Sequence, residues 1–213
     1  MHAPTAAGFA AILAVLTSAT AMATEEPGFK LLEKDGSFEL REYAPFIVAE
    51  TRVEAGFEEA GSVAFQRLFR YISGDNLAQQ QIAMTAPVTQ SSGTPRGEKI
   101  AMTAPVSQVA DGRAFLVAFT LPAGYTLATA PKPRDASIRI REVPRQLVAC
   151  WRYSGRWTLA NYRDSETLLR ERIKSRGLIA RGEPVLARYN PPFTPWFMRR
   201  NEVLIPVVQS ASR

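Results

Sequence analysis

The sequence predicts an α+β fold made of two similar halves, each with two strands followed by a helix. The first observation is an internal repeat, because residues 38–52 read FELREYAPFIVAETR and residues 138–152 read IRIREVPRQLVACWR. The second is that both copies begin with apolar and charged residues in alternation, the period of a half-buried strand. The third is a change to the helical period after each copy. We expect the repeat to cover about residues 38–72 and 138–173, and the two units to pack face to face around a seam where small-molecule clefts tend to lie.

The first 23 residues are predicted to be a secretory signal peptide. They contain no Lys, Arg, Asp or Glu, and an apolar stretch from Ala6 to Leu16 is followed by small residues that end at Ala23. This stretch is much shorter than the roughly 20 residues that a membrane-spanning helix needs. We therefore expect cleavage after Ala23, a periplasmic or secreted protein without a transmembrane segment, and a single domain over residues 24–213.

The composition excludes several kinds of site. The one His of the chain is His2, so the predicted mature protein has none, which excludes imidazole-based catalysis and zinc binding. The single Cys, Cys150, lies in an apolar run and is predicted to be a buried core thiol. The net charge of +6 comes from scattered basic residues without a basic run, which favours small anionic ligands over nucleic acid. We predict a monomer with no catalytic and no metal-ligating residues.

The first helix is expected from Gly56 to Ile72, with Gly74 as its C-terminal stop. Its apolar residues fill an arc of about 180°, although a helix on a core needs an arc of only about 100°. Phe65 and Phe69 lie on the surplus flank of this arc. They indicate either a second structural contact, such as a loop folded over them, or a ligand cleft with aromatic walls.

Further elements follow from local patterns. The seven residues IAMTAPV occur at Ile82–Val88 and again at Ile100–Val106, which predicts two strands around a long polar loop. A helix is expected at Thr158–Arg176 with Gly177 as its stop, and strands are expected at Phe115–Leu121 and Val203–Val208.

Six stretches together resemble the SOUL/haem-binding protein family, and they span most of the predicted mature chain. The stretches are FELREY with the strand after it (Phe38–Thr51), RYISGDN (Arg70–Asn76), the two MTAPV copies, Tyr153-Ser154-Gly155, and YNPPFTPWFMRRNEV (Tyr189–Val203). The last of these is the most specific.

The resemblance implies a distorted antiparallel β-barrel of two pseudo-symmetric halves, each with one helix packed on it. It also implies that haem or another tetrapyrrole binds non-covalently in an apolar cleft between the first helix and the Tyr189–Arg200 segment. Because the predicted mature chain lacks histidine, any axial atom would be a Tyr oxygen, a Met sulfur or the Cys150 sulfur. The residues implied for the ring and its propionates are Phe65, Phe69, Arg70, Phe193, Trp196, Phe197, Arg199 and Arg200.

Other interpretations stay open. Arg199 and Arg200 are equally well interpreted as structural residues that pair with Glu42 or Glu202. The duplicated fold is also similar to GyrI-like effector-binding domains, some of which hydrolyse small molecules, and Glu42 and Glu142 would then be the acid and base. A third hypothesis is an interaction module that binds no small molecule.

Overall fold

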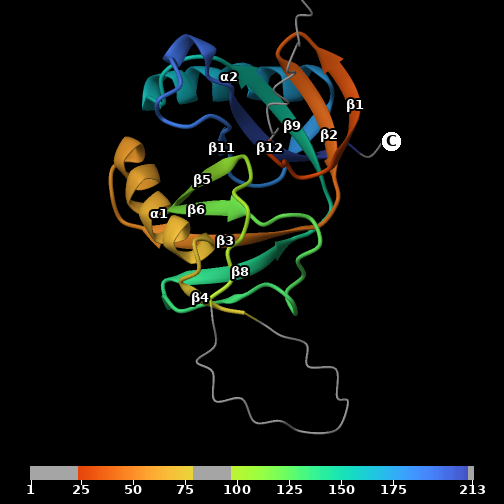
Figure 1. Ribbon diagram of the computed structural model, residues 1–213. Helices are drawn as coiled ribbons and strands as arrows, with labels where there is room; N and C mark the ends of the chain where they lie inside the picture. The colour runs from red at the N-terminus through yellow and green to blue at the C-terminus, as the bar shows by residue number, and fades with distance from the viewer. Residues whose placement is uncertain (1–23, 79–96, 211–213) are drawn as a thin grey trace, which may run out of the picture.

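The computed structural model of the protein describes residues 24–78 and 97–210. In these residues, ten antiparallel strands form one sheet, two short strands form another, and two α-helices pack on the large sheet (Figure 1). The elements are β1 (Phe29–Asp35), β2 (Phe38–Tyr43), β3 (Phe46–Val53), α1 (Phe57–Ile72), β4 (Asn76–Leu77), β5 (Val106–Asp111), β6 (Ala114–Thr120), β7 (Lys132–Pro133), β8 (Ile138–Val143), β9 (Gln146–Tyr153), α2 (Leu159–Ser175), β10 (Leu178–Ala180), β11 (Val185–Arg188), the 3-10 helix η1 (Trp196–Met198) and β12 (Asn201–Gln209).

The large sheet is curled but not closed. Its strand order is β1-β2-β9-β12-β11-β5-β6-β3-β8, with β10 paired to β12, and among the described strands the two end strands β1 and β8 do not pair. The predicted α+β class, with one helix on each half, is confirmed. The expected barrel therefore takes the form of an open, curled sheet.

The two halves are joined by strand pairing and do not simply pack face to face. Strand β2 of the first half pairs with β9 of the second, and β3 pairs with β8. Phe38 lies opposite Trp151, and Thr51 lies opposite Ile138. The two pairs are equivalent by the internal repeat, because position 38 corresponds to 138 and position 51 corresponds to 151. The break between β2 and β3 is Ala44-Pro45, which cannot supply the positive φ angles of a tight hairpin turn. The two strands therefore diverge and find partners in the other half.

Each helix covers its own core on the outer face of the sheet. Helix α1 packs against β3 and β6, and α2 packs against β9, β10 and β12. Both predicted helices are confirmed: α1 follows Gly56 and ends before Gly74, whose φ is +115°, while Thr158 caps α2 by accepting a hydrogen bond from the Asn161 amide. The buried apolar side chains form one cluster under α1 and another under α2.

The expected strand at Ile100–Val106 is wrong except for Val106, where β5 begins. The preceding residues have no regular structure, and the Ala104–Pro105 peptide bond is cis. Their amides bind elsewhere, since Ile100 N–H donates to the Ile72 carbonyl at the end of α1 and Ala104 N–H donates to the Glu25 carbonyl. The first IAMTAPV copy lies outside the described residues.

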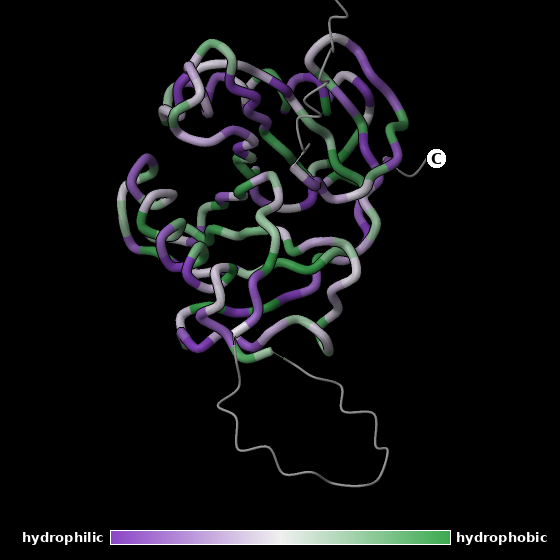
Figure 2. Tube along the Cα trace, viewed as in Figure 1, coloured by the Kyte–Doolittle hydropathy of each residue, from purple (hydrophilic) through white to green (hydrophobic). Residues whose placement is uncertain are grey.

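The inner face of the curled sheet carries ionic clusters. On β2, Phe38 and Leu40 belong to the core under α2, while Arg41 points to the opposite face and pairs with Glu39 and Glu202. This alternation gives the strands their mixture of hydrophobic and hydrophilic residues (Figure 2). The helices thus cover the outer face, and charged pairs lie on the inner face.

Candidate functional site

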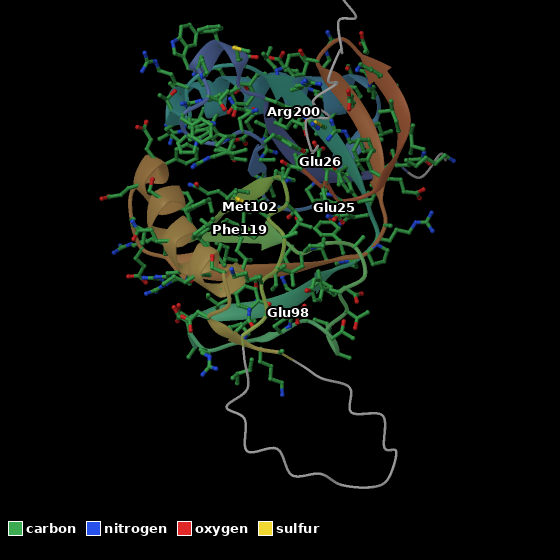
Figure 3. The ribbon with its side chains drawn as sticks, in the orientation of Figure 1. Glu25, Glu26, Glu98, Met102, Phe119 and Arg200 are labelled. Carbon is green, nitrogen blue, oxygen red and sulfur yellow. The ribbon has the colours of Figure 1, made fainter. Side chains whose placement is uncertain are left out.

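The surplus apolar flank of α1 has one partly buried member, Phe65, and one exposed member, Phe69. Phe65 packs edge-on against Phe119 of β6, with ring centroids 5.4 Å apart. Phe69 stacks on Phe65 at 5.6 Å and remains 46% exposed. The exposed side chain of Met102 lies near Phe119 in Figure 3, and the Thr103 hydroxyl donates to the Thr120 carbonyl beside them. Phe65 therefore has a structural contact, whereas Phe69 presents a ring face to the surface.

The segment before β12 presents four large apolar side chains to solvent. Phe193 is 86% exposed, and Trp196, Phe197 and Met198 of η1 are also exposed. The rings of Trp196 and Phe197 meet edge to face at 5.6 Å. A cluster of exposed aromatic side chains is typical of a binding surface.

Two of the predicted arginines hold this segment in place. Arg199 donates to the carbonyl oxygens of Thr194 and Pro192, at 2.8 and 2.7 Å. Arg200 pairs with Glu202 at 2.9 Å and with Glu26 at 2.7 Å. The structural interpretation is thus supported, with Glu202 as a partner of Arg200.

Arg70, the third predicted arginine, is less engaged. Its side chain is 65% exposed, and its Nη2 lies 3.8 Å from a carboxylate oxygen of Asp135, at the limit of an ion pair. Among the described residues, no ring contact, hydrogen bond or ion pair joins Arg70, Phe65 or Phe69 to the 193–200 segment. The two predicted parts of the site do not touch directly.

Arg188 of β11, which local sequence patterns did not indicate, lies between these parts. Its guanidinium lies over Gly61 of α1, so close that a Cβ atom at position 61 would be 2.2 Å from Nη1. Nη2 donates to Gln108 Oε1 at 2.6 Å. Nε is buried without a hydrogen-bond partner, and in the described part of the chain no carboxylate lies within ion-pair distance of this arginine. Burial lowers the pKa of Arg188 to about 10, although Tyr153 and Glu58 oppose this shift in part.

Trp157 extends the contacts from Arg188 toward η1. Its ring lies 5.3 Å from the Arg188 guanidinium and 4.2 Å from that of Arg199, and its Nε1 donates to Asn201 Oδ1 at 2.7 Å. Beyond it, Arg156 lies 5.8 Å from the ring of Trp196. Guanidinium and aromatic groups therefore connect α1 to the exposed aromatic cluster, and we call Arg188, Trp157 and Arg199 the bridging ladder.

Near the ladder, the Tyr153 hydroxyl is a second buried polar group that lacks a hydrogen-bond partner in the described part of the chain. It is close enough to Arg188 for their charges to interact. Burial raises the pKa of Tyr153 to about 12. Buried polar atoms without partners are rare in proteins, and each one calls for an explanation.

Local sequence carries little signal for the ladder. Arg188 ends a four-residue strand that takes its structure from its partners β5 and β12, and Trp157 lies in the loop before α2. The one local signal is the position of Trp157 shortly after the Tyr153-Ser154-Gly155 stretch. Only the fold brings these residues to α1.

The carboxylates considered for hydrolysis are poorly suited to it. Glu42 pairs with Arg145 at 2.9 Å, and the hydrogen bond from Arg145 lowers the pKa of Glu42. A general acid needs the opposite shift. Glu142 is exposed on β8.

Metal ligands and membrane-spanning elements are not evident in the described ranges. These residues contain no group of three or more His, Cys, Asp or Glu that could hold a metal ion. Cys150 is fully buried, as predicted, and burial raises the pKa of its thiol. No helix within residues 24–78 or 97–210 is long and apolar enough to cross a membrane.

Comparison with known proteins identifies the family. Residues 24–206 match the family described as SOUL heme-binding protein. The chain belongs to this family. Heme-binding protein 1 of Xenopus tropicalis is 28% identical over 173 residues, which are 80% of this chain and 84% of that protein. Heme-binding protein 2 of Homo sapiens is 41% identical over 76 residues, which cover 33% of this chain and 37% of the human protein.

Solved structures extend the likeness of the fold beyond the SOUL family. The C-terminal domain of EcmrR is 11% identical, with a TM-score of 0.52 over 81% of this chain and 98% of that domain. A hydrolase from Listeria innocua is 9% identical, with a TM-score of 0.50 over 81% of this chain and 92% of its own. At these identities the likeness concerns the fold alone.

Proposed function

We propose that this SOUL-family protein binds haem or another tetrapyrrole non-covalently, without a histidine ligand. The proposed surface consists of the open flank of α1, the bridging ladder and the aromatic side chains of residues 193–198. Family membership and the names of the two relatives support a tetrapyrrole as the ligand. The alternative, an interaction module without a ligand, would not explain why Arg188 Nε and the Tyr153 hydroxyl are buried without hydrogen-bond partners among the described residues.

Arg188 is the observation that carries this proposal. It is a partly buried cation whose Nε is buried without a hydrogen-bond partner, and among the described residues no carboxylate lies at ion-pair distance, which is a costly arrangement. A propionate at this position would accept charge-assisted hydrogen bonds from the guanidinium, and such bonds are about twice as strong as neutral ones. Arg70, at the far end of α1, is exposed and could meet a second carboxylate.

The apolar part of the ligand suits the aromatic side chains. A porphyrin is a flat apolar disc, and aromatic rings with open faces stack on such a surface. Phe69 offers an open face on α1, and Phe193, Trp196 and Phe197 offer exposed rings near the other end of the ladder. Covering these side chains would remove apolar surface from water.

In this proposal the protein holds the ring by packing and charge, and the iron needs no protein ligand. If the iron took a protein ligand, the exposed side chains of Met102 and Met198 would supply the available soft sulfur atoms. Cys150 is too deeply buried to serve. The residues of this chain therefore bind and orient the ring and shield one face from water.

Porphyrin titration of purified variants tests the proposal. Haemin and iron-free protoporphyrin would be titrated against the wild type, Arg188→Met and Trp196→Ala, with Arg170→Met as a control on α2 that leaves the ladder untouched. A hydrogen bond to a charged group is worth about 1.5 to 3 kcal/mol, so Arg188→Met should weaken binding about tenfold or more. The control should bind like the wild type. Unchanged affinity in both Arg188→Met and Trp196→Ala would refute this site.

We also propose that the protein is exported to the periplasm or secreted after cleavage behind Ala23. The support is the uncharged, apolar N-terminal sequence that ends in small residues. N-terminal sequencing of the protein from its native cells should then read Thr24 first. Recovery of Met1 in a membrane fraction would contradict export and return His2 to the mature chain.

A further inference from the structure

A cavity of about 260 Å³ lies inside the curled sheet, on the face opposite to the helices. Both halves of the fold contribute to its walls, with Val48 and Leu116 from one side and Val148 and Leu204 from the other. Its volume is below the roughly 300 to 1,000 Å³ of drug-sized pockets. A tetrapyrrole is too large for it, so the cavity is separate from the surface proposed above.

The walls are mostly apolar, with the polar side chains of Tyr43, Ser107, Thr120 and Gln146 among them, and they include part of an ion cluster around a buried carboxylate. Glu50, only 3% exposed on its side chain, accepts hydrogen bonds from Arg139 at one oxygen and from Arg141 at the other. Of the described lining residues, only Glu50 and Arg141 are charged. Two guanidinium groups face one carboxylate here, so the cluster has a net charge of +1.

Arg141 lines the cavity with a side chain that is 44% exposed, and it has unused hydrogen-bond donors. Its Nε donates to Glu50 at 3.0 Å and its Nη1 donates to the Glu142 carbonyl at 3.4 Å. Its Nη2 has no hydrogen-bond partner among the described residues. A carboxylate could accept a charge-assisted bond from Nη2, whereas an ammonium group would add to the positive charge.

The N-terminal segment forms part of the boundary of this cavity. Pro27 lines it, and the residues before Pro27 are tied to both halves. Glu25 accepts hydrogen bonds from the amides of Ala104 and Ala123, and Glu26 pairs with Arg200. Figure 3 shows Arg200, Glu26 and Glu25 following one another across the sheet. The cavity is therefore bounded by structured chain on this side.

We propose that the cavity binds a compact apolar monocarboxylate, of the size of a short fatty acid, with its carboxylate on Arg141 and its tail between the two halves. The apolar walls favour the hydrocarbon tail, and the net positive end favours the acid. Such a ligand would neutralise the cluster without displacing Arg141 from Glu50.

Calorimetric titration of the full chain with octanoate, 1-octanol and octylamine tests the chemical class. Octanoate should bind at least tenfold more tightly than octanol, and octylamine should bind most weakly. Protoporphyrin should not displace octanoate, because the two sites are separate. Equal binding of octanoate and octanol, tighter binding of octylamine, displacement by protoporphyrin or no octanoate binding at millimolar concentration would each overturn the proposal.

Three variants test whether octanoate binds in this cavity. Ala118→Phe puts a ring into the lining and should abolish octanoate binding while protoporphyrin binding stays within about twofold of the wild type. Arg141→Met should weaken octanoate at least tenfold and leave octanol within about twofold, which keeps the test decisive if Ala118→Phe does not fold. Arg139→Met is the matched control, since Arg139 bonds the same carboxylate but is 72% exposed and outside the lining. Octanoate affinity that is unchanged in Arg141→Met, or reduced equally in both arginine variants, would count against the site.

Discussion

Phe69 and its stacking partner Phe65 should respond differently to truncation because only Phe69 has an open ring face. Phe69→Ala should reduce the free energy of unfolding of the ligand-free protein by about 1 kcal/mol, since its ring is already partly wet. Porphyrin binding should weaken by about 1 to 2 kcal/mol through the lost aromatic contact. Urea unfolding and a porphyrin titration of the same variant measure both quantities.

Phe65→Ala is the matched comparison for Phe69→Ala. Phe65 is partly buried and packs on Phe119 of the core, so its truncation should cost more stability than Phe69→Ala, about 2 to 3 kcal/mol. If Phe69→Ala showed the large stability loss and unchanged porphyrin affinity, Phe69 would be a core residue and not part of a binding surface.

Glu202 should give the protein a marked loss of stability in acid. Burial alone would raise the pKa of Glu202, but Arg41, Tyr189 and Arg200 together outweigh it and lower the pKa from 4.5 to about 2. Because the folded-state pKa is lowered, the stabilisation is present above pH 4.5 and is lost as the pH falls toward 2. Between about pH 5.5 and about pH 2.5 the loss from this group should be about 2 to 3 kcal/mol.

Urea unfolding at these two pH values measures that contribution. Glu202→Gln should be less stable at about pH 5.5, since Arg41 loses one of its two buried carboxylate partners, but it should lose less stability on acidification. The exposed Glu142→Gln is the control and should follow the wild type. An equal pH dependence in Glu202→Gln and the wild type would show that another carboxylate is responsible.

Local sequence indicated some of these residue roles but not others. The surplus arc of α1 identified Phe65 and Phe69, because the spacing of residues along a helix fixes the direction of each side chain. It could not distinguish the two, since their exposure depends on Phe119 in a distant strand. Arg188 was missed because its environment is made by Gly61, Gln108 and Trp157, none of which is near it in sequence.

Among the elements, α1 can pack closely against Arg188 of the bridging ladder because residue 61 is a glycine. The Arg188 guanidinium occupies the space that a side chain at position 61 would fill. Gly61→Ala should stabilise α1 by up to about 1 kcal/mol through the higher helix propensity of alanine. The added methyl group should, however, push the Arg188 guanidinium away from α1. We expect porphyrin affinity to fall about fivefold to tenfold while stability changes by less than about 1 kcal/mol.

Ser62→Ala, one residue further along the exposed side of α1, is the control for Gly61→Ala and should leave porphyrin affinity unchanged. The measurements are a porphyrin titration and urea unfolding of both variants. Wild-type affinity in Gly61→Ala would mean that the position of Arg188 over α1 does not matter for binding.

Elements with strong local signals could be predicted, and those formed by distant pairing could not. Helices α1 and α2 combine a clear helical period with glycine stops, and both have bounds close to those expected. Strands β10 and β11 are three and four residues long, and their hydrogen bonds go to β5 and β12. The segment from Ile100 to Val106 shows the reverse error. Its repeated IAMTAPV pattern predicted a strand, but its backbone amides donate to the end of α1 and to the N-terminal segment instead.

In the whole molecule, the interlocked halves create two different environments. The outer face holds the helices and the proposed porphyrin surface, and the inner face holds the ionic clusters and the small cavity. Neither half could form this sheet alone, because β2 and β3 pair with β9 and β8 of the other half. Its position within this fold makes Arg188 a partly buried cation with no carboxylate partner at ion-pair distance in the described part of the chain, and the proposed porphyrin site rests on this feature.

Comparative titration of haemin and iron-free protoporphyrin is the sharpest test of whether the ring is held by packing and charge without an imidazole. Both ligands present the same ring and propionates, so their affinities should agree within about tenfold, a difference of about 1.4 kcal/mol. A preference for haemin of about a thousandfold, or about 4 kcal/mol, would show that the protein supplies a strong iron ligand and would contradict binding by packing and charge alone.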